Sequence, residues 1–306
     1  MLIKLITILL IVIGPFLMVG VIRKVKAFWA RRKGQRLLQG YYDFVKLLRK
    51  NEVGNAGEPI KIFPDISLAA LLSAALLVPY FGSGIFEFKY DFILFVALLG
   101  SSRFFSALNA MQYGSSFEGM GTAREMAFSV VVEPGYYVVI GTFACVGGVT
   151  NFAELHQVIS SFPTVISNLI ILLVAMALFI MMLAESCRIQ VDDPTTHLEL
   201  TMIHEVMILD NSGASLAYSI YGAYLKMLMF GGLISTLLMP AELSVFQQVL
   251  FGSLILLFTS ILVGITESVT ARLRMSHVPQ FLLVISALGA IVVFASVCVA
   301  AGMLHF

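Results

Sequence analysis

Long apolar stretches separated by polar segments dominate the chain, and eight of them are long enough to cross a lipid bilayer as helices. The hydrocarbon core of a bilayer needs roughly 20 predominantly apolar residues per helix. The pattern therefore predicts an all-α polytopic membrane protein with about eight transmembrane helices, which form a single membrane domain over residues 1–306. The predicted spans are residues 2–22, 64–84, 91–111, 125–148, 165–186, 216–239, 249–268 and 279–303.

The first of these stretches also has a feature of a signal peptide, because Lys4 precedes its apolar run. However, Gly14 and Pro15 interrupt the run, no small-residue cleavage site follows it, and seven more spans come after it. We therefore interpret it as a transmembrane helix.

Basic residues are distributed unevenly between the two sides of the predicted helices. Residues 23–63, between the first two spans, contain 11 of the 19 Lys and Arg residues. The loops on the opposite side contain Lys89 and almost no other basic residue. Cytoplasmic loops of membrane proteins have the excess of Lys and Arg. Residues 23–63 and 187–215 are therefore predicted to be cytoplasmic, and both termini are predicted to lie outside.

The first cytoplasmic loop contains a predicted amphipathic helix next to a basic cluster. From Leu37 to Leu48 apolar residues recur at helical spacing, while Asp43 and Lys46 occupy the other face. Such a helix is expected to lie on the membrane surface or under a docked partner. The basic residues expected to dock that partner are Arg31, Arg32, Lys33 and Arg36.

Five ionisable side chains fall within or at the ends of the predicted spans. An ionisable group at helix depth costs at least ~2.5–3.5 kcal/mol on insertion scales, so each is a candidate functional residue. Together they predict a path for protons or other ions. The five residues are Arg103, Glu133, Glu185, Lys226 and Glu267.

Glu133 and Lys226 occupy the most informative positions. Glu133 directly precedes Pro134, which removes a helical hydrogen bond and kinks the helix. The carbonyl freed in this way needs a partner or water. A carboxylate beside such a break is well placed to exchange protons with a hydrated cavity. Lys226 lies near the middle of its span, where a buried lysine readily loses its proton.

The alternative interpretation is a set of static ion pairs that only fix the packing of the helices. Candidate partners are given by sequence spacing and by the need to neutralise each buried charge. The candidate pairs are Arg103 with Glu118 or Glu133, Glu185 with Arg188, and Glu267 with Arg272 or Arg274.

Composition agrees with a membrane protein whose redox chemistry, if there is any, belongs to other subunits. The chain is 59% hydrophobic and 12% charged, against roughly 45–50% and about 25% in soluble domains. Its three cysteines, Cys145, Cys187 and Cys298, are far apart and do not form a metal-binding motif. His204-Glu205 is not followed by a second histidine at the spacing of a zinc motif. We therefore expect no metal or cofactor in this chain.

Several motifs resemble the complex I subunit 1 family (the H or ND-one subunit), in the hydrogenase-type branch typified by formate hydrogenlyase subunit 4. The likeness extends over nearly the whole chain. Its motifs are Arg31-Arg32-Lys33-Gly34 with Tyr42–Leu48, Gly121–Glu125 with Val132-Glu133-Pro134, Ala184-Glu185-Ser186-x-Arg188 with Asp192 and Pro194, Ser212-Gly213, Lys226, and Glu267–Arg274.

The resemblance implies a non-catalytic subunit that joins the membrane arm of an oxidoreductase complex to a peripheral redox arm, in a bacterial or archaeal cytoplasmic membrane. It implies iron–sulfur clusters, and in hydrogenase-type complexes nickel–iron centres, on peripheral partner subunits. Antiporter-like membrane subunits and lipid are the other expected partners, and nucleic acid is not expected. The residues expected in the coupling loop are Arg188, Asp192, Asp193, His197, Glu199, Glu205 and Asp210.

The chain departs from the family pattern in this acidic loop. Thr195, Thr196 and His197 follow Pro194, so two carboxylates of the family's "PEAE" motif are absent. Whether the chain helps to bind quinone therefore stays open, as does the choice between protons and sodium. Two other functions are also considered: a structural anchor with static ion pairs, and a stand-alone secondary transporter. A transporter would predict inverted repeats with paired broken helices, and Glu133-Pro134 has no symmetric counterpart in the sequence.

Overall fold

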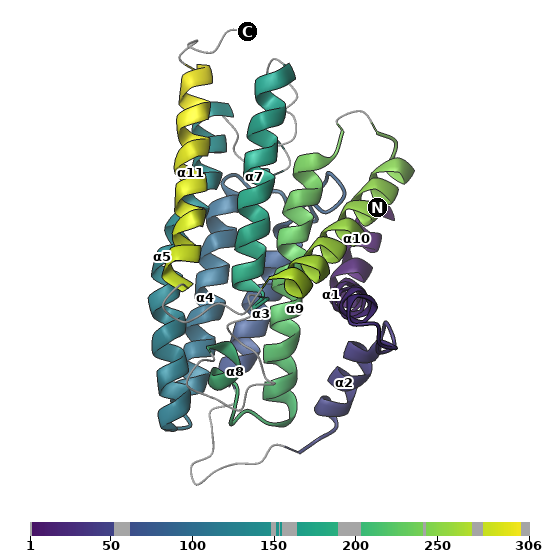
Figure 1. Cartoon of the computed structure of the whole chain (residues 1–306), viewed down its shortest axis with the longest axis vertical. Helices are drawn as coiled ribbons and strands as arrows, with labels where there is room; N and C mark the ends of the chain where they lie inside the picture. The colour runs from purple at the N-terminus through teal and green to yellow at the C-terminus, as the bar shows by residue number, and fades with distance from the viewer. Residues whose placement is uncertain are drawn as a thin grey trace.

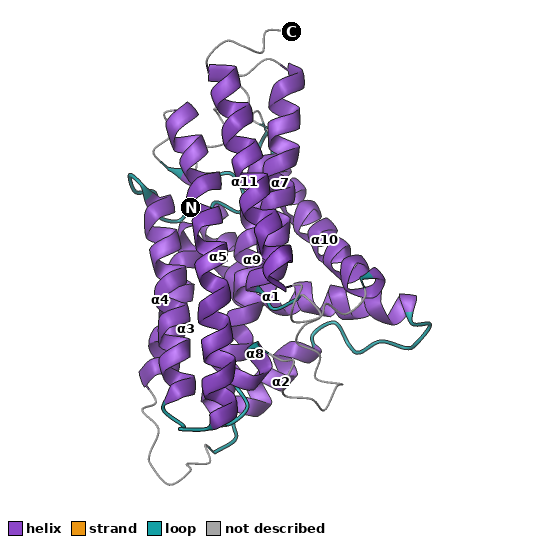
Figure 2. Cartoon of the chain, turned by 60° about the vertical axis from the view of Figure 1, so that its left-hand side comes forward, coloured by secondary structure: helices purple, strands orange, loops and turns teal. Residues whose placement is uncertain are grey.

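The computed structural model describes residues 2–51, 62–147, 151–152, 154, 164–188, 203–240, 243–270 and 278–300, and these residues form helices and loops without a strand. The predicted all-α fold is therefore confirmed (Figures 1 and 2). The helices are α1 (Leu2–Trp29), α2 (Gln39–Leu48), α3 (Ile62–Leu77), α4 (Asp91–Met111), α5 (Ser116–Gly147), α7 (Thr164–Glu185), α8 (His204–Met207), α9 (Gly213–Leu238), α10 (Val245–Val269) and α11 (Val278–Ala300).

Each predicted span overlaps a helix, and these helices are α1, α3, α4, α5, α7, α9, α10 and α11. Helix α3 ends at Leu77, before the predicted end at residue 84, and α5 begins at Ser116, before the predicted start at residue 125. Among the described residues, five helices are long and apolar enough to cross a membrane, namely α1, α4, α7, α9 and α10. Two apolar helices are shorter, at Ile62–Leu77 and Leu283–Ala295. The exact number of spans thus stays a prediction. Helix α1 continues to Trp29, beyond the predicted end at residue 22, because its basic residues end the apolar stretch but not the helix.

Helix α9 lies at the centre of the bundle. It packs against α1, α3, α7 and α10, and α2 contacts it from the end that is lower in Figure 1. In its most apolar window 78% of residues are buried, against 33% in α10, which crosses the other helices obliquely at the edge (Figures 1 and 2). Helices α3 and α4 form one pair beside α9, and α11 packs on α5 and α7. Side chains on α9 can therefore meet groups from most of the molecule.

The predicted amphipathic helix is present as α2, and its inner face is seated on this chain. Phe44 lies 5.4 Å from Tyr221 and 5.6 Å from Phe16, measured between ring centroids. Tyr41 makes an edge-on contact with Phe16 at 5.8 Å. Aromatic pairs at such separations stabilise a contact beyond the area they bury. Helix α2 is thus fixed to α1 and α9, while apolar residues such as Leu38 stay exposed.

The chain between α1 and α2 passes so close to α1 that only glycine fits at residue 20. A Cβ atom added to Gly20 would lie 2.0 Å from the carbonyl oxygen of Leu37. Backbone atoms cannot relieve such an overlap without moving the segment. The position of α2 therefore depends on Gly20.

We expect Gly20→Ala to displace the α1–α2 connection and to destabilise the protein by about 1–3 kcal/mol, the usual cost of overpacking. The midpoint of thermal unfolding of the purified protein in detergent should fall by a few degrees. Gly119→Ala is the matched control, because a Cβ atom at Gly119 in α5 would meet nothing within 4 Å. An equal response of the two variants would contradict this account.

Candidate functional site

Arg103 is the centre of a buried ion network that joins three helices. It lies on α4, and only 4% of the residue is exposed. Its guanidinium group donates to Glu133 on α5 at 2.5 Å and to Glu185 at the end of α7. Its Nε lies 3.9 Å from the carboxylate of Glu125, which is also on α5. A charge this deeply buried needs such partners, because desolvation of an unpaired cation is very costly.

Glu185 links this arginine to a second cation. Its Oε1 accepts from Arg103, and its Oε2 accepts from the ammonium group of Lys226 on α9 at 3.1 Å. Glu185 is the last residue of α7, where the partial negative charge of the helix end disfavours a carboxylate. The two cations offset both this effect and the cost of removing the carboxylate from water. Arg103, Glu133, Glu185 and Lys226, predicted separately, are thus one connected network.

Tyr136 belongs to the same site and was not predicted. Its side chain is buried and its ring stacks on Phe230 at 5.6 Å, and its buried hydroxyl lies close to Glu185 without forming a hydrogen bond to any described residue. It lies three residues after Glu133, which on a helix places both on one side of α5. That spacing is the signal that could have identified it, since a tyrosine in an apolar stretch is otherwise ordinary.

Glu267 forms a second network that connects the ends of α1, α7 and α10 with the middle of α9. Its carboxylate lies 2.7 Å from Lys26 of α1 and 3.5 Å from Arg188, just beyond α7. Arg188 also stacks over the ring of Tyr224 on α9 at 5.7 Å, and Arg23 donates to the Tyr224 hydroxyl at 3.2 Å. The end of α10, which bears Glu267, is thereby tied to α1, α7 and α9.

These contacts correct the proposed local pair between Glu185 and Arg188. Helix α7 ends at Glu185, and Cys187 adopts a left-handed backbone conformation with φ of 54°. The helical spacing that would bring the two side chains together is therefore interrupted, and Arg188 pairs with Glu267 instead. The other proposed partners of Glu267, Arg272 and Arg274, lie outside the described residues.

Of the two carboxylates proposed for Arg103, Glu133 is confirmed and Glu118 is not. Glu118 is fully buried near the start of α5, where it accepts a hydrogen bond from the backbone N–H of Asp210 at 3.1 Å. It therefore holds the segment between α8 and α9 against α5. Glu205 lies in α8. The other expected coupling residues, Asp192, Asp193, His197 and Glu199, lie outside the described residues.

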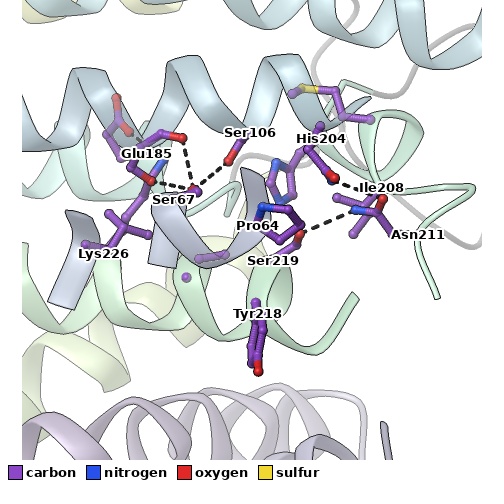
Figure 3. A pocket seen from close by; sticks show the side chains of 16 residues that line it. Pro64, Ser67, Ser106, Glu185, His204, Ile208, Asn211, Tyr218, Ser219 and Lys226 are labelled. Carbon is purple, nitrogen blue, oxygen red and sulfur yellow. Dashed lines mark hydrogen bonds and ion pairs between the residues drawn. The ribbon is translucent and has the colours of Figure 1, made fainter. Parts of the chain in front are cut away.

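A polar cavity extends from the ion network between α3, α4 and α9 (Figure 3). Glu185 and Lys226 line one end, and His204 and Asn211 line the other. The space open to the centres of water molecules is about 40 Å³, enough for a few waters. Hydroxyl and amide groups therefore line the cavity between Lys226 and the residues around α8.

Neutral polar side chains on α4 line this cavity, and the charge pattern of the sequence did not predict them. The Ser67 hydroxyl of α3 lies 2.9 Å from those of Ser102 and Ser106 on α4. One turn further along α4, the Asn109 amide donates to Asn211 at 3.1 Å. The spacing of residues 102, 106 and 109 places them on one face of a helix. This polar stripe is the feature of the sequence from which the cavity lining could have been predicted.

The network and the cavity lie within a chain that a family model described as NADH dehydrogenase matches over residues 2–298. The chain belongs to this family. Among its relatives in Escherichia coli (strain K12), hydrogenase-4 component C is 28% identical over 282 residues, which are 87% of this chain and 86% of the relative. Formate hydrogenlyase subunit 4 is 26% identical over 282 residues, covering 89% and 90%.

A solved structure shows the same fold as this member of the NADH dehydrogenase family. A chain of the membrane-bound sulfane sulfur reductase, an archaeal respiratory membrane complex, superimposes with a TM-score of 0.80. The match covers 96% of this chain and 98% of the other, at 17% sequence identity. The family resemblance and the all-α membrane architecture inferred from the sequence are therefore confirmed.

Removal of the Glu185 carboxylate should destabilise the protein strongly, because it removes the ion-pair partner that the structure shows for Lys226 and one of those of Arg103. Breaking a buried ion pair costs about 3–5 kcal/mol, so Glu185→Met should lower the midpoint of thermal unfolding in detergent. Glu87→Met, at an exposed carboxylate, is the control. The double variant with Lys226→Met should recover part of the loss. A Glu185→Met protein as stable as the control would contradict the network.

Proposed function

We propose that this protein is a membrane subunit of a complex I-like, hydrogenase-related respiratory complex. In that complex it docks the peripheral redox arm and couples electron transfer to the translocation of protons or sodium. The buried network of Lys226, Glu185, Arg103 and Glu133 is the observation on which the proposal rests. The names of the two Escherichia coli relatives, components of hydrogenase-4 and of formate hydrogenlyase, support this class of complex.

The charge of the network is suited to the uptake of one cation. Arg103 and Lys226 supply two positive charges, while Glu125, Glu133 and Glu185 supply three negative ones. When all five groups are ionised, the sum is −1. One proton on a carboxylate makes the network neutral without removing any side chain from it. Charges interact strongly where water is excluded. That proton therefore changes how strongly each of the two cations that share Glu185 is attracted to its carboxylate.

The two ends of the network are open to different surroundings. Lys226 and Glu185 line the polar cavity, so waters there can exchange protons with them. The Glu133 side chain does not line this cavity and is 41% exposed. We propose that ions pass between these ends, with Arg103 as the fixed charge that holds both carboxylates. Glu267 belongs to the second network and is proposed to transmit movement of the loops rather than ions.

The basic cluster on the first loop is proposed as the docking site of the peripheral arm. Arg31, Arg32, Lys33 and Arg36 are all exposed between α1 and α2. Arg188, whose ion pair with Glu267 joins the ends of α1, α7 and α10, is proposed to start the coupling loop. We further propose that this loop includes Asp192, Asp193, His197, Glu199, Glu205 and Asp210.

The same proposal places all metal centres outside this chain. Iron–sulfur clusters, and nickel–iron in a hydrogenase-type complex, are assigned to the peripheral subunits, and antiporter-like subunits to the membrane arm. The chain would then form one membrane domain in a bacterial or archaeal cytoplasmic membrane, with both termini outside. Within the described ranges, no group of three or more His, Cys, Asp and Glu side chains is arranged to hold a metal ion.

A structural anchor is the second candidate function, and one observation favours it. Arg103, Glu133, Glu185, Lys226 and Glu267 all have an ion-pair partner within this chain. Static pairs of this kind would fix helix packing without any transfer of ions. The two candidates differ in what neutralisation of Glu133 does to a complex that still assembles.

Glu133→Gln should abolish ion translocation by the assembled complex, because the amide cannot take up or release a proton. Its effect on assembly should be small, because the half-exposed amide can still accept a hydrogen bond from Arg103. Ion uptake into sealed membrane vesicles, driven by the electron donor of the complex, measures the result. Glu87→Gln, the same change at an exposed carboxylate, is the control. Unchanged translocation in Glu133→Gln would favour the anchor.

Lys33→Glu should weaken retention of the peripheral subunits, and the difference from the unaltered chain should be largest at low ionic strength because salt screens the interaction that the substitution changes. The fraction of peripheral subunits that co-purifies with the chain, measured over a salt series, gives the result. Lys89→Glu makes the same charge reversal at an exposed residue outside the basic cluster. Equal retention by the two variants at every salt concentration would refute docking at the basic cluster.

A further inference from the structure

Helix α5 has an exposed stripe that contains a carboxylate. Met126, Val130 and Tyr137 are 39%, 70% and 52% exposed, and the side chain of Glu133 is 41% exposed. The spacing of these residues, 126, 130, 133 and 137, follows the alternation of four and three residues by which one helix packs along another. The stripe thus has the geometry of a helix-packing surface that nothing in the described chain covers.

The carboxylate in this stripe is poorly suited to contact with lipid. Glu133 lies near the middle of α5, a helix of 32 residues that is about 48 Å long at 1.5 Å per residue. Ionisable side chains at such depth almost always face the interior of a bundle or a hydrated cavity. Arg103 contacts the carboxylate from within, but the outer side of Glu133 remains exposed.

Another group on the same stripe is also a hydrogen-bond acceptor. Pro134 is exposed beside Glu133 and has no N–H, so the carbonyl of Val130, one turn earlier, lacks its helical donor. In the hydrocarbon region a carbonyl freed in this way must find a donor elsewhere. The carboxylate of Glu133 and this carbonyl are both acceptors, so this part of the surface needs donors from a partner.

The charge of the site also indicates a partner surface that supplies positively charged hydrogen-bond donors. Three carboxylates face two cations in the network around Arg103, and two of the three, Glu125 and Glu133, are the more exposed ones on α5. The excess of negative charge thus lies toward the outside. On the neighbouring α4, Phe104 directly follows Arg103 in the sequence and is 51% exposed, so this helix also presents apolar area to the outside.

We propose that the α4–α5 face is a subunit interface, covered by a transmembrane helix of another subunit that presents a lysine or arginine opposite Glu133. The cation pairs with the outer side of Glu133 when that carboxylate is ionised and supplies the hydrogen-bond donors, and the apolar residues of the stripe supply the packing. The inference rests on the proposed function only in placing the chain within a multi-subunit membrane complex. It assigns a surface and a partner chemistry that ion coupling alone does not require.

Site-specific photocross-linking in the native complex tests the interface. A photoreactive benzoylphenylalanine replaces Val130 in the full chain, and the cross-linked peptides are identified by mass spectrometry. Phe258, 57% exposed on α10, takes the same substitution as the control for site specificity. The expected adduct of residue 130 lies in a transmembrane helix of a different subunit, within two turns of a lysine or arginine. Adducts to lipid only, to a second copy of this chain, or to a segment without such a cation would overturn the proposal.

A charge reversal tests the chemistry of the pair. Glu133→Lys should lower the amount of the cross-linked subunit that co-purifies by about tenfold or more, as for other close charge pairs. Glu133→Gln keeps an acceptor and should retain it. Reversal of the partner's cation to glutamate should restore retention by Glu133→Lys, which also excludes simple misfolding. Equal retention by Glu133→Lys and the unaltered chain would refute the pairing.

Retention and translocation are separate measurements, so the two proposals can fail independently. If Glu133→Gln still translocates ions, the coupling role of Glu133 fails while the interface stands. If the residue 130 adducts are lipid only, the interface fails while the coupling role stands.

Discussion

Glu185 is held between the guanidinium group of Arg103 and the ammonium group of Lys226, and the arrangement of the helix bundle depends on this bridge. Each of the three charges comes from a different helix, α4, α7 or α9. None of them is tolerable alone at its depth, because an unpaired buried ion must be desolvated without compensation. The bridge therefore fixes the relative positions of three helices in a way that apolar packing does not.

The central position of α9 extends this constraint to the rest of the molecule. Lys226 lies two residues after Tyr224, which contacts Arg23 and Arg188, and five after Tyr221, which contacts Phe44 of α2. The loop proposed to dock a partner is thus seated on the helix that provides a cation to the buried network. A shift of α2 reaches Lys226 through little more than one turn of α9.

Much of the fold and of the site follows from the sequence because long apolar stretches, and the charges within them, are strong signals. Charges such as Arg103 and Glu133 stand out within apolar stretches, so candidate residues were found without knowledge of the fold. Their partners were harder to assign, since helical spacing predicted Glu185 with Arg188 and the turn at Cys187 prevented it. Tyr136 and the Ser67 cluster were missed, because neutral polar residues in membrane helices are common and only the fold brings these together.

The buried network also has a consequence for how the chain enters the membrane. Translation delivers Arg103 first, and Glu133 arrives with the next helix, so α4 and α5 can insert as a hairpin that neutralises itself. Glu185 follows on α7, but its second cation comes only with α9. Insertion of α7 is therefore stabilised by the hairpin that precedes it and completed by the helix that follows. The network is therefore complete only when Lys226 of α9 has joined α4, α5 and α7.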